Sequence, residues 1–359
     1  MIATGIQSWF YKHIAKPIFF KQDPEKVHDR VLGVGKVLGG STLSKAVVGA
    51  VMRYKNPILV QEIRGVRFPN PVGLAAGFDK NAELTELLPD VGFGFEEIGS
   101  ITGEYCEGNP KPRLWRHPEL QSLRVYYGLK NDGCEAISAR LKDREFEIPI
   151  GVSVAKTNCA ATVETGAAIS DYVKAYIAFK DIGSYDTINI SCPNAHGGQP
   201  FTDVARLSEL LVALNEKRND KPMFLKLSPD LDLERLHEIA TVAKESRVDG
   251  LVVSNLTKKH DFGDGGLSGK SVEPHALGHL QYLAKEFKND FVLISCGGIF
   301  SAKDTYERIK NGASLVQLAT GMIFEGPQLI GEINRDLAKM IKDDGFSNIS
   351  DAIGADVWR

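Results

Sequence analysis

The stretch VLISCGGIFSAKDTYERIKNGASLVQLATG, residues 292–321, contains one complete strand–helix–strand unit. Two short and nearly continuous apolar runs, Val292–Ser295 and Val316–Ala319, are typical of parallel strands that are buried on both faces. Between them, Ala302–Asn311 has the pattern of an amphipathic helix that leads from one strand to the next. The unit predicts an α/β fold with a parallel sheet.

The same unit recurs along the chain from residue 60 onward. Six further apolar runs predict strands over Val72–Ala76, Glu96–Ile101, Ile148–Val154, Thr187–Ser191, Met223–Leu227 and Gly250–Ser254. Helical patterns lie between most of them, for example over Val163–Phe179, Val204–Asn215, Leu233–Glu245 and Pro274–Phe287. Eight such units in roughly 260 residues predict a (β/α)8 TIM barrel. A doubly wound open sheet is the alternative, and the lack of GxGxxG after any strand counts against it.

The first 55 residues carry a different pattern, that of short amphipathic helices. A first helix is expected around apolar residues that recur at helical spacing, namely Ile6, Trp9, Phe10 and Ile14. Asp23-Pro24 predicts the N-cap and first residue of a second helix. Ser41 or Thr42 opens a third. The sequence therefore predicts an N-terminal helical extension ahead of the barrel.

Two interpretations of this extension stay open. Its helices form either a cap packed on the main domain or a monotopic patch that binds a membrane surface. In the second case apolar residues enter the lipid interface, while Lys12, Lys16 and Lys21 lie at the level of the head groups. We expect three regions: a helical, membrane-associating segment at 1–55, the barrel at 56–345 and a C-terminal tail at 346–359.

Composition excludes several classes of protein. With 359 residues, 43% hydrophobic and 25% charged, the chain resembles an ordinary globular protein. A net charge of −3 gives no electrostatic footprint for nucleic acid. The five cysteines lack any CxxC pair, which fits a reducing compartment and argues against a disulfide framework or a zinc ribbon. We expect no secretory signal, because the N-terminus lacks a basic region followed by a clean apolar run and an A-x-A site. We expect no membrane-spanning helix, because no window has 18 uninterrupted apolar residues.

The residues just past each strand locate the chemistry, because the loops after the strands build the site of a (β/α)8 barrel. This polar set is rich in Asn and Lys and contains no carboxylate. It shows no cluster of His, Asp and Glu, so no catalytic metal is expected. Paired carboxylates for glycoside hydrolysis are also missing. His196 lies in a loop, where a single histidine is usually solvated.

Two glycine turns predict a phosphate site. Gly297-Gly298 follows the seventh strand and Thr320-Gly321 the eighth, which is where many TIM barrels bind phosphate. The alternative is a pair of tight turns without a ligand.

Two lysines at strand ends predict a bound anion. Lys80 and Lys226 have no evident Asp or Glu neighbour, so ligand anions are the expected partners of their charges. Lys226 could stabilise the negative N1–C2=O edge of a reduced flavin. The alternative is that each lysine reaches solvent.

An amide-rich loop suggests a flat ring as the substrate. Asn189, Asn194 and Asn255 both donate and accept hydrogen bonds, which suits a ring that carries C=O and N–H groups, such as a pyrimidine. Cys192 lies between two of them and can act as a base, since an unperturbed thiol has a pKa of about 8.5. The alternative is that Cys192 is a small buried hydrophobic residue.

These residues lie in motifs that resemble the dihydroorotate dehydrogenase family. The matching stretches are PVGLAAGFDKN (71–81), GNPKPRLWR (108–116), NISCPN (189–194), LKLSPDL (225–231), VVSNLT (252–257), GGLSGK (265–270), CGGI (296–299) and SLVQLATGMIFEGP (314–327). The resemblance implies an FMN-binding (β/α)8 barrel that oxidises dihydroorotate to orotate in pyrimidine (UMP) biosynthesis. The extension at 1–55, with KQDPEKVHD, is similar to that of the membrane-associated, quinone-reducing class 2.

The resemblance also implies where and with what the protein works. It implies a peripheral membrane protein, on the cytoplasmic face of a bacterial inner membrane or on the mitochondrial inner membrane. The partners are dihydroorotate or a similar ring and a quinone, with no nucleic acid and no obligate protein partner.

Each site residue has a role implied by the family. Cys192 is the base that removes the C5 proton while the C6 hydride goes to flavin N5. Lys80, Asn189, Asn194 and Asn255 bind the substrate. The flavin is held by Ala76, Gly77, Lys80, Ser100, Ser153, Asn189, Lys226, Ser254, Asn255, Gly269, Gly297, Gly298, Thr320 and Gly321.

Several positions depart from the family pattern. Class 2 proteins carry Ser where Cys192 stands, and Val125 replaces a substrate-binding Asn in VYYGLKN (125–131). Tyr127 replaces a Met, Ser153 a flavin-site Asn, and Ala319 a Tyr of class 2. Two alternatives therefore stay open: an FMN-dependent paralogue that acts on another dihydropyrimidine-like ring, and an inactive FMN-binding scaffold.

Overall fold

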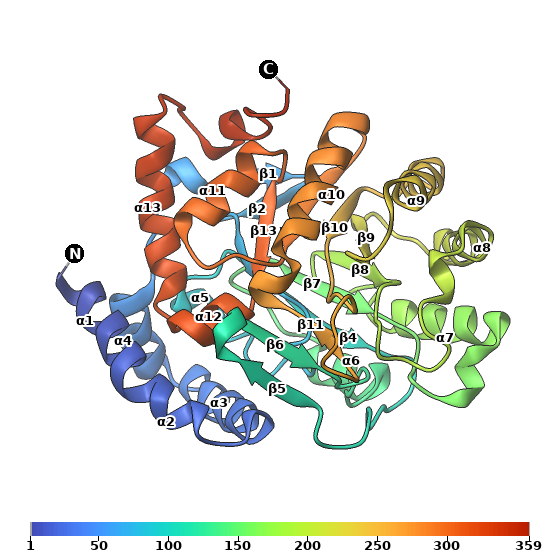
Figure 1. Cartoon of the computed structure of the whole chain (residues 1–359), viewed down its shortest axis with the longest axis horizontal. Helices are drawn as coiled ribbons and strands as arrows, with labels where there is room; N and C mark the ends of the chain where they lie inside the picture. The colour runs from blue at the N-terminus through green and yellow to red at the C-terminus, as the bar shows by residue number, and fades with distance from the viewer. Residues whose placement is uncertain (1, 359) are drawn as a thin grey trace.

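Eight parallel strands close into a barrel in the computed structural model, which describes residues 2–358 (Figure 1). In chain order they are β3 (Val72–Leu74), β4 (Phe95–Ile101), β7 (Ile150–Val154), β8 (Tyr185–Asn189), β9 (Met223–Leu227), β10 (Gly250–Val253), β12 (Val292–Cys296) and β13 (Leu315–Leu318). β13 pairs back onto β3 and completes the cylinder. The predicted TIM barrel and its eight strands are confirmed, with strand ends that differ by one or two residues.

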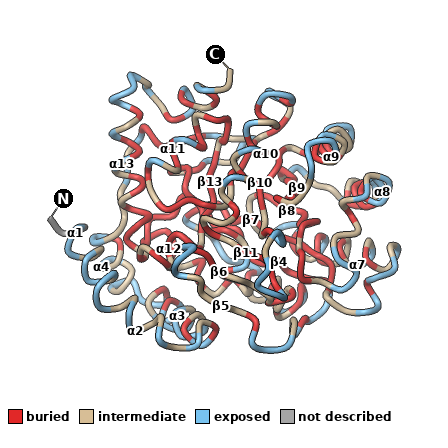
Figure 2. The backbone as a smooth tube through the Cα atoms, viewed as in Figure 1, coloured by how far each residue is buried: buried red, intermediate tan, exposed pale blue. Residues whose placement is uncertain are grey.

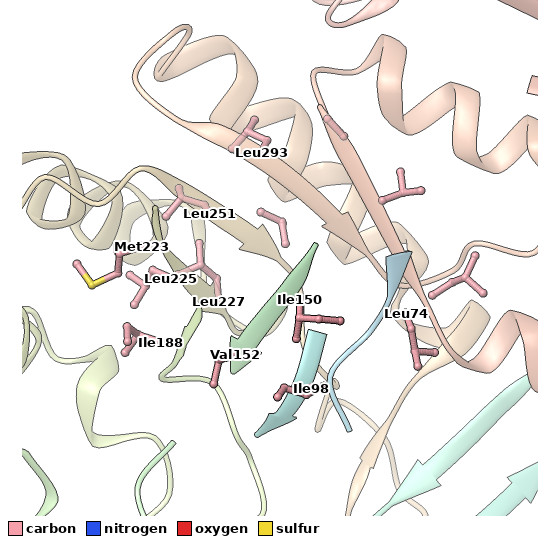
Figure 3. Packing of buried hydrophobic residues seen from close by; sticks show 14 of the residues in the cluster. Leu74, Ile98, Ile150, Val152, Ile188, Met223, Leu225, Leu227, Leu251 and Leu293 are labelled. Carbon is pink, nitrogen blue, oxygen red and sulfur yellow. The ribbon is translucent and has the colours of Figure 1, made fainter. Parts of the chain in front are cut away.

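Helices surround the barrel as a ring on its outside (Figure 1). They are α5 (Leu88–Val91), α6 (Cys134–Leu141), α7 (Thr165–Ala178), α8 (Val204–Asn215), α9 (Leu233–Glu245), α10 (Glu273–Glu286), α11 (Ala302–Lys310), α12 (Thr320–Glu325) and α13 (Leu329–Asp343). α8 and α9 begin where the side chains of Asp203 and Asp232 accept hydrogen bonds from backbone N–H groups in the first turn. The largest cluster of buried apolar residues includes side chains of both the strands and the surrounding helices. Figure 3 shows members of this cluster from the strands, such as Leu74, Ile150 and Leu225.

The interior of the barrel changes character along the strands. Near their start, Phe95, Tyr185 and Phe224 form an aromatic layer together with Phe68. Phe68 comes from the hairpin of β1 (Gln61–Ile63) and β2 (Val66–Phe68), which the sequence pattern did not reveal. Two residues further along the strands, the inward side chains become polar, since side chains alternate between faces. The polar chemistry therefore lies toward the carboxyl ends of the strands.

A second small sheet lies at the carboxyl end of the barrel. It consists of β5 (Leu114–His117), β6 (Ser122–Val125) and β11 (Gly266–Leu267), all antiparallel (Figure 1). These strands were not predicted, because they are short and β11 pairs with a strand about 140 residues earlier in the chain. Short 3-10 helices complete the loops: η2 (Pro57–Leu59), η3 (Pro118–Leu120), η4 (Ala160–Val163), η5 (Pro200–Thr202), η6 (Gly269–Val272) and η7 (Ile349–Ala352).

The N-terminal extension is helical and packs beside the barrel near α12 and α13 (Figure 1). It comprises α1 (Ile2–Phe10), the π-helix η1 (Tyr11–Ala15), α2 (Lys16–Phe20), α3 (Pro24–Gly39) and α4 (Thr42–Met52). The predicted N-caps are confirmed: Asp23 accepts from the N–H of Lys26 and Ser41 from that of Ser44. Within residues 2–358, only the pair α3 and α4, bent by 110° at their junction, has enough length and apolar composition to be considered as a membrane span, and no single helix does.

Much of the extension is exposed (Figure 2). Many of its exposed side chains are large and apolar. Eleven of the eighteen exposed large hydrophobic side chains of the described residues lie on it: Ile6, Trp9, Phe10, Ile14, Ile18, Val31, Val34, Val37, Leu43, Val47 and Val51. Lys16, however, lies over the rings of Phe20 and Phe324, and Lys12 pairs with Glu325. These two lysines thus contact neighbouring side chains of α2 and α12, whereas Lys21 is exposed, and the placement of the three lysines at head-group level stays a prediction.

Residues after 345 fold back onto the helices. Ile349 is fully buried, and the indole N–H of Trp358 donates to the carbonyl of Ala284 in α10 at 2.8 Å. The division of the chain at residues 55 and 345 stays a prediction.

Candidate active site

One cavity at the carboxyl end of the barrel gathers the residues that the sequence singled out. It is lined by Ala76, Gly77, Lys80, Ser100, Asn189, Cys192, Asn194, Lys226, Ser254, Asn255, Gly269, Gly297, Gly298, Thr320 and Gly321. They meet there because each stands near the carboxyl end of a barrel strand or in the loop that follows. Ser153 does not line the cavity: it is fully buried, with its hydroxyl 2.7 Å from that of Ser100. Ser153 therefore contacts the site through Ser100.

The surroundings of Lys226 contradict the prediction that it has no carboxylate neighbour. Its Nζ lies 3.3 Å from Oε1 of Glu97, which is fully buried. The other oxygen of Glu97 accepts hydrogen bonds from the Thr187 hydroxyl at 2.9 Å and the Gln317 amide at 2.8 Å. Burial by itself would lower the pKa of Lys226, but the charge of Glu97, the interaction with Cys296 and the hydrogen bond to Glu97 together outweigh burial, and the pKa is raised. Lys226 is thus a fixed cation in the wall of the cavity.

Replacing Glu97 by Ala is expected to lower the free energy of unfolding by about 3–5 kcal/mol, because Lys226 is left as an unpaired buried charge. Urea unfolding followed by circular dichroism, on preparations of equal cofactor content, measures the loss. Thr187→Val is the matched control: it removes one neutral donor to the same carboxylate and should cost about 1 kcal/mol. Equal losses in the two variants would contradict the importance of the ion pair.

Lys80 carries a less strongly held charge. Burial, together with repulsion from Lys130, lowers the pKa of Lys80 to about 8. Its Nζ lies 4.0 Å from the centre of the Tyr127 ring, a cation–π geometry. None of the ion pairs formed within residues 2–358 involves Lys80. No carboxylate among the described residues pairs with it, and its binding of an anionic ligand stays a prediction.

The asparagine side chains form a connected set. Asn189 Oδ1 accepts from the Ser191 hydroxyl at 2.9 Å and from the Asn255 amide at 3.3 Å, while its own amide donates to Ser100 at 2.8 Å. Asn194 donates to the carbonyl of Val125 at 2.8 Å. Its Oδ1 is buried and has no hydrogen-bond partner among the described residues. An unpaired buried acceptor is costly, so Asn194 is suited to accept an N–H of a bound ring.

Cys192 is half-buried and lines the same cavity. Burial raises the pKa of its thiol to about 11, against which the N–H of Asn194 and the charge of Lys156 act. The unperturbed pKa used in the sequence argument was therefore wrong for this site. The consequence is a thiolate that is rarer at neutral pH but accepts a proton more strongly when formed.

Backbone conformation and close packing require glycine in both turns. Gly297 and Gly298 have φ of +114° and +77°, values that other residues rarely adopt. A Cβ on Gly298 would lie 2.3 Å from the Glu273 Cβ, and one on Gly321 only 2.1 Å from the Ile299 carbonyl oxygen. α12 begins at Thr320, so its first N–H groups have no carbonyl one turn earlier within the helix. Both turns line the cavity, which is compatible with a phosphate there.

Sequence reasoning missed an apolar arm of this cavity. Its lining includes Leu114, Leu123, Phe300 and Ile323, which lead toward the N-terminal extension. It also missed His28 of α3, which lines the cavity and donates from Nε2 to the Phe78 carbonyl at 2.8 Å. Burial lowers the pKa of His28 to about 3, so its ring is neutral. No local pattern marks these residues, because their partners lie far away in the sequence.

Metal binding has no candidate among residues 2–358, where no group of three or more His, Cys, Asp or Glu side chains is arranged to hold an ion.

Comparison with known proteins identifies the family. The sequence model of the family described as dihydroorotate dehydrogenase matches residues 58–341. A protein of Helicobacter acinonychis named dihydroorotate dehydrogenase (quinone) is 39% identical over 349 residues, which is 95% of this chain and 98% of that protein. A protein of the same name from Sulfurimonas denitrificans is 38% identical over 353 residues, 95% of this chain and 97% of its own.

Solved structures agree with this result. The crystal structure of a DHODH from Eimeria tenella in complex with ferulenol superposes with a TM-score of 0.84 at 29% identity, covering 94% of this chain and 96% of that one. The ligand-free form from the same organism gives a TM-score of 0.83 and covers the same share of this chain. The chain belongs to the dihydroorotate dehydrogenase family, in its quinone-dependent class.

Proposed function

We propose that this oxidoreductase oxidises dihydroorotate to orotate with FMN as the bound cofactor and a quinone as the final electron acceptor, a step of pyrimidine biosynthesis. The names of the relatives support the substrate pair, and the family is flavin-dependent. The observation that carries the proposal is the single cavity in which the Lys226–Glu97 pair, the asparagine set, Cys192 and the glycine turns meet.

The residues present fit a flavin mononucleotide. Around Gly77, with φ of +99°, a Cβ would meet nothing within 4 Å, so the backbone is open to close approach by a ring. The Ser254 hydroxyl is buried without a partner among the described residues and is available to a ligand. FMN would be held by the backbone at Ala76 and Gly77, by Ser100 and Lys226, and at the phosphate by Gly269, Gly297, Gly298, Thr320 and Gly321. When bound, it supplies the acceptor for the hydride.

The remaining polar groups suit the substrate and its proton. Lys80 is the cation for a ring carboxylate, and Asn189, Asn194 and Asn255 bind the ring edges. Cys192 takes the proton from C5 as the hydride leaves C6, so that orotate and a neutral thiol result. Holding these groups around one ring supplies the orientation that such a coupled step needs.

Membrane association is part of the same proposal. Eleven exposed large apolar side chains gather on the extension, and exposed apolar surfaces of this kind mark interaction sites that a membrane interface would bury. The apolar arm of the cavity leads toward α12, and there Tyr11 of the extension donates to the Ile323 carbonyl at 2.7 Å. A quinone from the membrane would enter there. We therefore propose a peripheral membrane protein, in which residues 1–55 bind the membrane and 56–345 bind FMN.

The test of the function is the absorbance of the flavin when the purified protein meets dihydroorotate without oxygen. Bleaching of the flavin absorbance followed by recovery on adding a quinone is the expected result. A yellow protein that no substrate bleaches would instead indicate the inactive scaffold.

A cofactor-free preparation is expected to take up one non-covalent FMN per chain, because the glycine turns suit a mononucleotide. Fluorescence titration and the mass of the released cofactor measure this. Lys226→Met should weaken uptake, since it removes the cation from the cavity wall and leaves Glu97 unpaired. Binding of FAD in preference to FMN would contradict the proposed phosphate site.

One observation favours a second candidate function. Val125 lines the cavity, and its backbone carbonyl accepts a hydrogen bond from Asn194, while its apolar side chain has no hydrogen-bonding group to offer a ring. A ring with fewer hydrogen-bonding groups on that edge would leave fewer unpaired polar atoms. Bleaching by another dihydropyrimidine-like ring, but not by dihydroorotate, would assign the protein to such a paralogue.

A further inference from the structure

The loop that carries Cys192, residues 190–199, is held by side chains from two other loops. We call it the base loop. The carbonyl of His196 accepts from Lys156 Nζ at 2.7 Å, and the N–H of His196 donates to Asn158 Oδ1 at 2.7 Å. The carbonyl of Asn194 accepts from the Asn109 amide at 3.0 Å. The loop is therefore fixed on both sides of its middle.

Lys156 is the one charged group among these anchors. It follows β7 by two residues, is only 3% exposed, and takes part in none of the ion pairs found within residues 2–358. Besides His196, it approaches the hydroxyl of Thr162 at 3.5 Å. Burial lowers the pKa of Lys156, and interactions with Cys159, Cys192 and Asp171 act against burial. A buried ammonium without a paired carboxylate is costly and calls for a functional reason.

Several groups surround the sulfur of Cys192. Burial raises the pKa of the thiol, and so does Cys106 from the loop after β4. Lys156 and, from the loop after β10, Lys258 lower it. Tyr172 of α7 lies nearby, with its hydroxyl engaged by the Asn189 carbonyl at 2.8 Å. Lys258 is exposed, so solvent and salt screen it, whereas the charge of Lys156 acts through the protein interior.

We propose that Lys156 is a positioning residue for proton abstraction: it anchors the base loop through the His196 carbonyl, and its charge favours the thiolate of Cys192. The proposal rests on Cys192 being the base. Its electrostatic part concerns the protein alone and can be measured without turnover.

The experiment follows the alkylation of Cys192 by iodoacetamide against pH in the full-length flavoprotein, with the modified peptide quantified by mass spectrometry. Only the thiolate reacts, so the rate reports the thiolate population. In Lys156→Met, the rate at pH 8 should fall about tenfold, because the loss of a buried positive charge that favours the thiolate is expected to raise the pKa of the thiol by about one unit. Lys156→Arg should restore most of the rate.

Two further variants separate charge from anchoring. Lys156→Gln keeps a donor for His196 but loses the charge, so its alkylation should resemble that of Lys156→Met even where the Met variant folds poorly. Lys258→Met removes the exposed cation and should change the rate less than twofold. The substrate-driven rate of flavin reduction should fall in parallel with alkylation across the Lys156 series.

An alkylation profile of Lys156→Gln identical to that of the parent protein would overturn the proposal. An equal fall in Lys258→Met and Lys156→Gln would also overturn it. A failure of the proposed function can be told apart from a failure of this proposal. Full turnover in Cys192→Ala would show that Cys192 is not the base. The alkylation series would still report the coupling between Lys156 and the thiol.

Discussion

Cys192→Ala is expected to reduce its flavin with dihydroorotate about 10²–10⁴-fold more slowly than the parent protein, because a proton must leave C5 and the nearby base is gone. Anaerobic stopped-flow absorbance measures this half-reaction without the quinone. FMN content and substrate affinity should stay close to those of the parent, since Asn189, Asn194, Asn255 and Lys80 are untouched. Full activity at all pH values would mean that the thiol only fills space.

The rate of flavin reduction should depend on pH through the ionisation of Cys192. With a pKa raised to about 11, the thiol is the dominant form at pH 7, and the thiolate increases about tenfold per pH unit up to that value. The rate of flavin reduction in the parent protein should therefore rise with pH through the neutral range. Cys192→Ser carries a far less acidic hydroxyl. If Cys192→Ser stays active and its pH optimum shifts upward, the site uses the proton path of class 2. If its activity falls nearly to that of the Ala variant, the site is built around the thiol.

Deletion of residues 1–21 is expected to abolish quinone reduction while dihydroorotate still bleaches the flavin. The deletion removes α1, η1 and α2 with their exposed apolar side chains, and with them the contacts to α12. The deletion ends before α3. Glu25 of α3 forms a buried ion pair with Arg113 at 2.8 Å, and losing this pair would disturb the loops at the carboxyl end of the barrel. Steady-state turnover with a quinone in lipid vesicles, compared with anaerobic bleaching, separates the two half-reactions.

A matched pair of point variants controls for general loss of apolar surface. Trp9→Ser lies on the extension and should weaken vesicle binding, whereas Val212→Ser on α8 is equally exposed and should not. Quinone turnover at the parental KM in the deletion variant would favour the interpretation of the helices as a plain cap.

Much of the fold and of the site followed from the sequence because both are written in local patterns. Buried parallel strands are continuous apolar runs, and helices between them repeat with their own period, so eight units sufficed to predict the barrel. Once the barrel is given, the residues after each strand must meet at one end. The sequence therefore suffices to place Lys226, Asn189, Cys192 and Gly298 together, and all four line the cavity.

The tertiary structure alone decided which faces these residues share and what they pair with. Glu96 and Glu97 are neighbours in one buried strand, yet Glu97 points inward to Lys226, 129 residues away. Both carboxyl oxygens of Glu96 are instead buried without a hydrogen-bond partner among the described residues, and burial, followed by the charge of Asp79, raises the pKa of Glu96. The sequence could not distinguish them, because in a strand buried on both faces no alternation of polar and apolar residues marks the inward one. The pKa of the Cys192 thiol also depends on the tertiary structure. Burial raises it and the charge of Lys156 lowers it, and both act on the thiol only once the chain has folded.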